Sequence, residues 1–148
     1  MHRMVTWTAC SIVLLFVGVA PIQAQFSMRA ASAQPVEGWQ RMQVEHSETM
    51  VWVSPAAAVV ASDIEKAQPE VRDDGDRVIR VIFTEVGANK IRQLTTAQLR
   101  KHVALVVDGR LIWAPMVQAV VGKESVLTGS GPAGLTQEEV ERIIASLR

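Results

Sequence analysis

Residues 103–115 read Val-Ala-Leu-Val-Val-Asp-Gly-Arg-Leu-Ile-Trp-Ala-Pro. The Asp108-Gly109 pair lies between two apolar runs, and Asp-Gly is a strong signal for a type I′ hairpin turn, whose two central residues have positive φ. A two-residue turn predicts four opposed pairs, each sharing a face of the sheet: Val107 with Arg110, Val106 with Leu111, Leu105 with Ile112, and Ala104 with Trp113. Both faces of this hairpin are then largely apolar, so we expect it to lie inside a sheet with other elements packed on it.

The composition of the 148-residue chain is that of one globular domain, with 49% hydrophobic and 20% charged residues. The formal net charge is zero and Lys and Arg form no long run, so we expect no nucleic-acid partner. The one cysteine, Cys10, lies in the N-terminal apolar segment. This position argues against a disulfide or a cysteine nucleophile in a mature chain.

Residues 1–24 have the pattern of a secretory signal peptide. Arg3 contributes to a basic start, residues 8–20 are mostly apolar, and Ala24 is the small residue that signal peptidase prefers. The apolar run is short for a membrane-spanning helix, which needs about 20 residues, although an uncleaved anchor stays open as the alternative. We therefore predict an exported protein, periplasmic or extracellular, that meets the membrane only through this segment if it is not cleaved.

The rest of the first half predicts short elements. Residues 25–36 are rich in Ala, Ser and Gln without periodicity, so we expect a flexible lead-in to a folded domain over residues 37–148. Strand alternation is seen over residues 39–46, and residues 50–53 form a second short strand. Residues 62–67 begin Ser-Asp-Ile-Glu, a capping-box pattern that predicts a short helix.

The second half predicts further strands and two longer helices. Asp74-Gly75 is another hairpin-turn signal and introduces an alternating strand over residues 77–83. Thr84 is placed to cap a helix whose small and apolar residues recur at helical spacing, and two threonines after Leu94 should end or kink it there.

Beyond the central hairpin, residues 116–121 are interpreted as a strand and residues 125–128 as a short one. Thr136 and Glu139 form a capping box for a final helix with an apolar stripe. Together these elements predict an α+β domain, with a mainly antiparallel sheet and two main helices and one short helix packed on it.

No catalytic, cofactor or metal site is predicted from the motifs. The glycines of residues 129–134 match a dinucleotide-binding fingerprint, but the βαβ unit and the later acidic residue are absent, so we interpret them as a Gly-rich loop. Residues 73–76 lack the alternate ligands and distal Glu of a calcium loop. His46 and His102 are isolated in sequence, which argues against a metal site, while a Ser/His/Asp triad assembled in space stays open.

Four segments of the chain together make up one recognisable sequence pattern. They read Arg-Val-Ile-Arg-Val-Ile-Phe-Thr-Glu-Val-Gly-Ala at 77–88, Ala-Leu-Val-Val-Asp-Gly-Arg-Leu-Ile-Trp-Ala-Pro at 104–115, Leu-Thr-Gly at 127–129, and Glu138-Glu139 in the last helix. The most specific runs are Phe-Thr-Glu-x-Gly-Ala and Asp-Gly-x-x-Ile-x-Ala-Pro. Over residues 37–148 this pattern resembles the head subdomain in the first periplasmic domain of SecD, the accessory subunit of the bacterial preprotein translocase.

The resemblance implies a non-catalytic α+β module outside the membrane that handles polypeptide during export, in association with the Sec translocase, without cofactors. Trp113 stands where that family has a small residue. We therefore predict a binding module that takes an extended polypeptide or an envelope protein partner on an apolar surface or a sheet edge. The candidate partner-binding surface contains Trp113, Arg110 and Trp52. Two alternatives stay open: a small exported hydrolase with a spatially assembled site, and a structural or assembly protein of the cell envelope.

Overall fold

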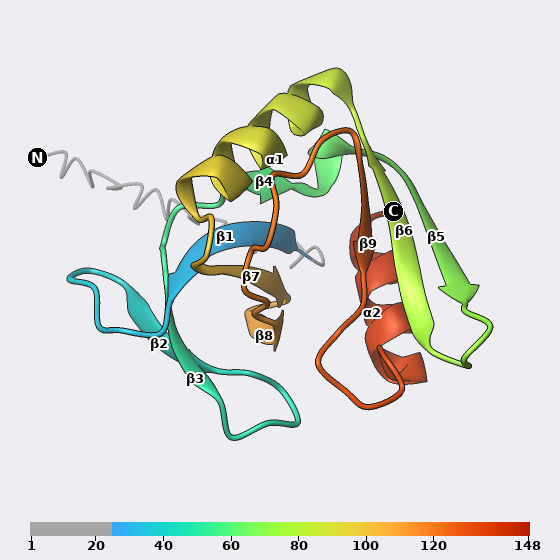
Figure 1. The fold of residues 1–148 in the computed structure, drawn as a ribbon, viewed down its shortest axis with the longest axis horizontal. Coiled ribbons are helices and arrows are strands. Elements are labelled where there is room, and N and C mark those ends of the chain that lie inside the picture. Colours follow the sequence, from blue (N-terminus) through green and yellow to red (C-terminus); the bar gives the residue numbers. More distant parts are fainter. Residues whose placement is uncertain (1–24) are drawn as a thin grey trace, which may run out of the picture.

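The computed structural model describes residues 25–148, which form two antiparallel sheets and two α-helices (Figure 1). The α+β class with a mainly antiparallel arrangement and two main helices is confirmed. The strands divide into a six-stranded and a three-stranded sheet, where the sequence pattern predicted one sheet. The predicted signal peptide, residues 1–24, lies outside the described residues.

The first sheet is built around β1, a strand that the sequence did not predict. The strands of this sheet are β1 (Phe26–Ser32), β2 (Gln40–Gln43), β3 (Met50–Val53), β4 (Val59–Val60), β7 (His102–Val107) and β8 (Arg110–Trp113). They follow the order β2-β3-β1-β7-β8, and β4 also pairs with β1. The predicted flexible lead-in is therefore wrong over residues 26–32. Phe26 faces the larger core while Ser27 and Ala31 are also buried, so neither side of this central strand shows polar alternation.

The two edges of the first sheet meet. Val44, directly after β2, forms a parallel bridge with Leu111 of β8, and the Glu45 main-chain N–H donates to the Leu111 carbonyl oxygen at 2.8 Å. The closed sheet surrounds a second, smaller core of Ala31, Val44, Val51, Val53, Ala104, Val106 and Leu111. Because the residues of this second core are mostly Ala and Val, the space that the closed sheet surrounds is narrow.

The central hairpin has the predicted turn, with positive φ of 53° at Asp108 and 76° at Gly109. The predicted pairs of Val107 with Arg110 and of Val106 with Leu111 are confirmed. A β-bulge then shifts the register, so Leu105 pairs with Trp113, and the two outer predicted pairs are wrong. Both faces of the hairpin are buried, as predicted, since one faces each core.

The second sheet contains β5 (Ile64–Val71), β6 (Arg77–Phe83) and β9 (Glu124–Leu127), in the order β5-β6-β9. The predicted short helix over residues 62–67 is wrong, because only a 3₁₀ turn, η1 (Ala61–Asp63), precedes β5. The Asp63 carboxylate accepts the Val60 N–H at 2.9 Å, and the chain then pairs along β6. Pro69 is tolerated because β5 is an edge strand.

The helices begin at their predicted caps. Thr84 Oγ1 accepts the Gly87 N–H at the start of α1 (Glu85–Ala97), and Thr136 and Glu139 form a reciprocal capping box at α2 (Gln137–Ser146). The first helix continues past Leu94, because the Thr95 hydroxyl donates to the Ile91 carbonyl oxygen at 2.7 Å instead of ending the helix. Residues 116–121 form only isolated bridges, so the strand predicted there is wrong.

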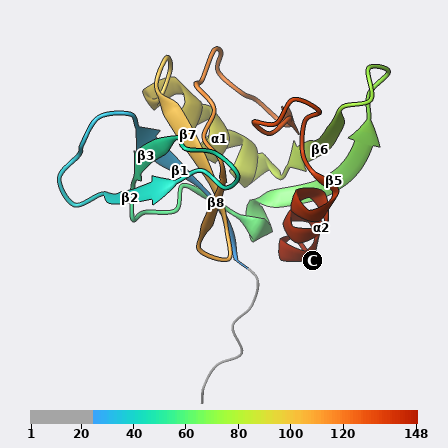
Figure 2. The same ribbon diagram turned by 90° about the horizontal axis from the view of Figure 1, so that it is seen from below.

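Both helices and both sheets contribute side chains to the larger core. Figures 1 and 2 show the arrangement of these elements from two directions. In Figure 2, α2 lies beside β5. Among residues 25–148, no helix is long and apolar enough to cross a bilayer.

The outer face of the second sheet carries an ion-pair ladder that predicts pH dependence. Arg80 Nε donates to Glu70 Oε1 at 2.9 Å, and this hydrogen bond lowers the pKa of Glu70. A carboxyl group with a lowered folded pKa stabilises the fold above its unfolded pKa, and that contribution is lost as the pH falls through the folded value. Glu70→Gln should therefore flatten the loss of thermal stability between about pH 5 and pH 3. Glu65→Gln, an exposed position on the same strand, is the control; equal pH slopes for both variants would contradict the prediction.

Candidate functional site

An apolar hollow lies at the end of β8 that carries Trp113. It has a volume of about 330 Å³ and lies between α1, the end of the hairpin and the connection from β8 to β9. We call it the Trp113 hollow; its lining includes Met28, Ile91, Trp113, Pro115, Met116 and Val121. Its lining is mainly apolar, with Thr95, Gln118 and Ser125 as the polar residues. Such a surface suits an apolar side chain better than a charged ligand.

The Trp113 indole is partly buried against the larger core and also lines the hollow. The β-bulge produces this position, because it places Ile112 and Trp113 on the same core instead of on opposite faces. Met116 and Val120 nearby in sequence are 48% and 47% exposed, so the β8–β9 connection presents large apolar side chains to solvent. Exposed apolar side chains that continue a hollow are typical of a protein-binding surface.

Hydrogen bonds hold the walls of the hollow. Thr95 Oγ1 accepts the Val121 N–H at 3.0 Å, which fixes the connection onto α1. His102 Nδ1 lies 2.9 Å from the Ala114 carbonyl oxygen at the end of the hairpin. Among the described residues, no buried side-chain nitrogen or oxygen lacks a hydrogen-bond partner. The hollow therefore has pre-formed walls with no spare buried polar group directed at a ligand.

A second opening, the β2–β8 groove, has a volume of about 400 Å³ and is lined by residues 40–46 and 109–111. It lies between β2 and β8, the two edge strands of the first sheet, next to the bridge between Val44 and Leu111. The Val44 N–H donates to Thr49 toward β3, whereas the Glu45 N–H donates outward to Leu111. Main-chain groups alternate in direction along a strand, so those of Arg41 and Gln43 face the groove. Outward-facing main-chain groups of a strand edge are the kind of groups with which a further strand can pair.

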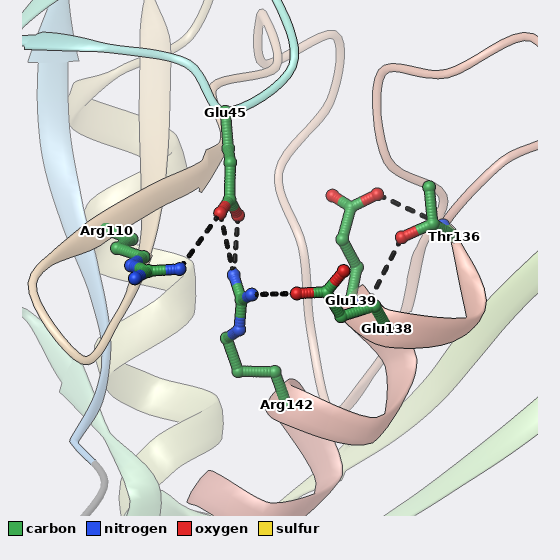
Figure 3. A network of polar contacts seen from close by, with 6 residues as sticks. All are labelled: Glu45, Arg110, Thr136, Glu138, Glu139 and Arg142. Carbon is green, nitrogen blue, oxygen red and sulfur yellow. Dashed lines mark hydrogen bonds and ion pairs between the residues drawn. The ribbon is translucent and has the colours of Figure 1, made fainter.

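Two residues that line the groove, Glu45 and Arg110, belong to an ion-pair network with Arg142 and Glu138 (Figure 3). Arg142 Nη1 donates to both carboxylate oxygens of Glu45, at 2.9 and 2.6 Å, and its Nη2 donates to Glu138 at 2.6 Å. Arg110 lies 3.5 Å from Glu45 on the other side. The hydrogen bonds that Arg142 donates to the Glu45 carboxylate raise the pKa of this partly buried guanidinium. The network joins α2 to the first sheet.

The predicted surface residues occupy different features. Trp113 lines the hollow and Arg110 lines the groove. Trp52 lies on β3 and does not line the groove. The guanidinium carbon of Arg41, which does line it, is 5.6 Å from the centroid of the Trp52 ring. Met116, an exposed residue that lines the hollow, was not among the predicted surface residues, because residues 116–121 were interpreted as a strand.

A third groove, of about 430 Å³, separates α2 from β5. Its lining includes Pro69 and Ile144 together with Glu70, Arg77, Glu141 and Arg148, so its charges are mixed. Within residues 25–148, no group of three or more His, Cys, Asp or Glu side chains could hold a metal ion.

Comparison with known families and proteins gives consistent matches. Residues 38–148 match the family described as SecDF, P1 head subdomain. The protein translocase subunit SecD of Magnetococcus marinus is 29% identical over 86 residues, which are 57% of this chain and 16% of that protein. The subunit SecDF of Thermus thermophilus is 30% identical over 91 residues, 61% of this chain and 12% of that protein.

The SecD subunit of Syntrophobacter fumaroxidans is 24% identical over 135 residues, 88% of this chain and 25% of that protein. The chain thus spans a quarter or less of the length of these relatives.

Solved structures show the same fold. A crystal structure of SecDF in a super-membrane-facing form has a TM-score of 0.63 at 23% identity, covering 84% of this chain and 18% of that one. A structure described as that of a membrane component SecDF that enhances protein export has a TM-score of 0.59 at 19% identity, covering 84% and 61%.

Proposed function

The chain belongs to the SecDF P1 head subdomain family, and we propose that it is a non-catalytic module of protein export that binds extended polypeptide in the periplasm. Its relatives are translocase subunits, and one structural neighbour is described as enhancing protein export. Association with the Sec translocase is the corresponding proposal for its partner. The observation that carries the polypeptide-binding role is the Trp113 hollow.

The chemistry of the hollow favours an unfolded chain as the ligand. A polypeptide that has not folded exposes apolar side chains, and burying each one releases about 1.5–3 kcal/mol. Met116 at the rim is unbranched and polarisable, so it adapts to side chains of different shape. An export module must accept many sequences, and an adaptable apolar surface provides this tolerance.

The β2–β8 groove adds main-chain recognition to this surface. Arg110 and Trp113 are the first and last residues of β8, so their Cα atoms are separated by about 10 Å along the strand. A short extended segment is long enough to reach both features. Hydrogen bonds to a strand edge do not depend on side chains, which again suits a ligand of variable sequence.

Truncation of the indole tests this function. Trp113→Ala should weaken binding of a fluorescently labelled, permanently unfolded polypeptide about tenfold, the loss typical of an anchoring aromatic side chain. Fluorescence anisotropy measures the affinity, and circular dichroism confirms that the variant is folded. Met116→Ser, at an exposed rim position, should weaken binding by a smaller factor without affecting the core.

Trp39→Ala is the matched control, because Trp39 lies outside the strands and does not line the hollow. Equal losses for Trp39→Ala and Trp113→Ala would show that the hollow is not the binding site. Absence of any binding by the unaltered protein would contradict the function itself.

A further inference from the structure

The segments that supply most of the lining of the Trp113 hollow carry mainly basic charges. Between Glu85 and Glu124 the chain has six Lys and Arg residues and one acidic residue, Asp108. Asp108 forms the hairpin turn, at the opposite end of β8 from Trp113, and its carboxylate accepts the Gln25 N–H. The positive charges of this stretch are therefore not balanced by acidic residues within it.

Three of the basic residues, Arg100, Lys101 and Lys123, lie beside lining residues of the hollow, and we call them the basic rim. The Arg100 N–H donates to the Val117 carbonyl oxygen at 2.9 Å, and the Val117 N–H donates to the Lys101 carbonyl oxygen at 2.8 Å. Lys123 is two residues after Val121 in the chain. All three rim residues are exposed, and none forms an ion pair with a carboxylate of residues 25–148.

The carboxylate next to the rim in sequence is already engaged. Glu124 follows Lys123 directly, and its side chain pairs with Arg80 on the outer face of the second sheet. The rim charges are thus left for a ligand. The hollow itself has no charged residue in its lining, so an uncharged cavity lies directly beside unpaired cations.

The turn that carries two of the rim residues is held in place. The buried Gln98 side chain donates to the carbonyl oxygens of Ala31 and His102, at 3.0 and 2.9 Å. Arg100 has a φ of 63°, in the left-handed region that favours glycine. An arginine at this position has a conformational cost that glycine would not have, and such strain is found most often at binding positions.

We propose that the hollow selects extended polypeptide segments in which an apolar anchor side chain is flanked by Asp or Glu residues. This inference rests on the proposed polypeptide-binding function and specifies which segments bind. The anchor enters the uncharged hollow. Carboxylates within about three positions of the anchor reach the basic rim, since an extended chain advances about 3.3 Å per residue. Charge complementarity of this kind adds specificity and speeds association.

Labelled peptides test the preference by fluorescence anisotropy. They share one central phenylalanine in a chain of Ser and Thr, and they differ only in the residues beside it, which are Glu, Gln or Lys. Each exposed ion pair adds up to about fivefold in affinity, so the Glu peptide should bind about tenfold more tightly than the Gln peptide in about 50 mM NaCl. The Lys peptide should bind more weakly than both. Because salt screens exposed charges, the preference should fall to about twofold in about 0.5 M NaCl.

Arg100→Gly removes one rim charge and relieves the strained φ, so thermal unfolding should show no loss of stability. The variant should bind the Glu peptide about threefold more weakly and the Gln peptide unchanged. Arg72→Gln, at an exposed position after β5, is the matched control, because it changes the net charge equally outside the rim. Equal losses of Glu-peptide affinity in the two variants would overturn the proposal.

Three other results distinguish this proposal from its premise and from a lipid ligand. Equal affinities for the Glu and Gln peptides, both lost in Trp113→Ala, would overturn the selectivity and leave the proposed function standing. Binding of no peptide at all would overturn both. Binding of phosphatidylglycerol vesicles that Arg100→Gly weakens, with no preference among the peptides, would overturn the proposal in favour of a lipid surface.

Discussion

Gly87→Ala is expected to lower the free energy of unfolding by about 3 kcal/mol, the upper range for inserting an atom into a packed interior. A Cβ atom at position 87 would lie 2.1 Å from the Asp63 main-chain oxygen. Asp63 cannot move away easily, because this oxygen also accepts the Thr84 N–H at 2.9 Å and its carboxylate binds Lys90 at 3.0 Å. The first turn of α1 therefore requires glycine.

The sign of this effect distinguishes the contact from helix propensity. Alanine in a helix interior is favoured over glycine by about 1 kcal/mol, so propensity alone predicts stabilisation. Gln93→Ala, at an exposed position of the same helix, is the control and should change stability by less than about 0.5 kcal/mol. Urea unfolding measures both variants, and a Gly87→Ala protein as stable as the unaltered one would refute the contact.

The same geometry explains the most specific motif of the chain. In Phe-Thr-Glu-x-Gly-Ala, Thr84 caps α1 and Gly87 allows the main chain at Asp63 to approach the helix. The motif thus builds the junction between η1 and α1. Its residues hold the fold together and do not line the Trp113 hollow.

Arg142→Met should destabilise the domain by about 2 kcal/mol. The substitution keeps an apolar stem but leaves the Glu45 carboxylate, which is 18% exposed, with only the longer contact to Arg110. Removing one partner of a fully buried pair costs about 3–5 kcal/mol, and the partial exposure here reduces that loss. Arg92→Met on the exposed side of α1 is the control, and thermal unfolding measures both.

A double-mutant cycle with Glu45→Gln isolates the ion pair. Because the two side chains make two hydrogen bonds, we expect a coupling of about 1 kcal/mol between the substitutions. Strictly additive effects would mean that Arg142 stabilises α2 only through its stem and its contact with Glu138.

Local chemistry explains which elements the sequence predicted. The Asp108-Gly109 turn and the box of Thr136 and Glu139 depend on residues at most three positions apart, so their signals are complete within the segment. The capping-box pattern at residues 62–65 was misleading because pairing along β6 overrides a short helical preference. The pairing register of β7 and β8 beyond Val106 was also mispredicted, because nothing in the hairpin sequence specifies a β-bulge.

The lead-in was mispredicted for a different reason. β1 is buried by segments that lie much later in the chain, and small residues such as Ala31 suit its position over the narrow second core. Composition alone does not distinguish such a strand from a flexible segment. The site shows the same limit: Trp113 could be singled out, but the ion pair of Glu45 with Arg142 joins residues 97 positions apart.

The most direct measurement is a titration of the nitrogen-15-labelled protein with an unfolded polypeptide, followed by the indole N–H resonances in NMR spectra. Substitution of each tryptophan by phenylalanine assigns the resonances. If the domain binds polypeptide at the Trp113 hollow, the Trp113 resonance shifts and saturates while the Trp39 resonance stays unchanged. A Trp113 resonance that does not move while the polypeptide binds to saturation would contradict the assignment of the hollow as the binding site.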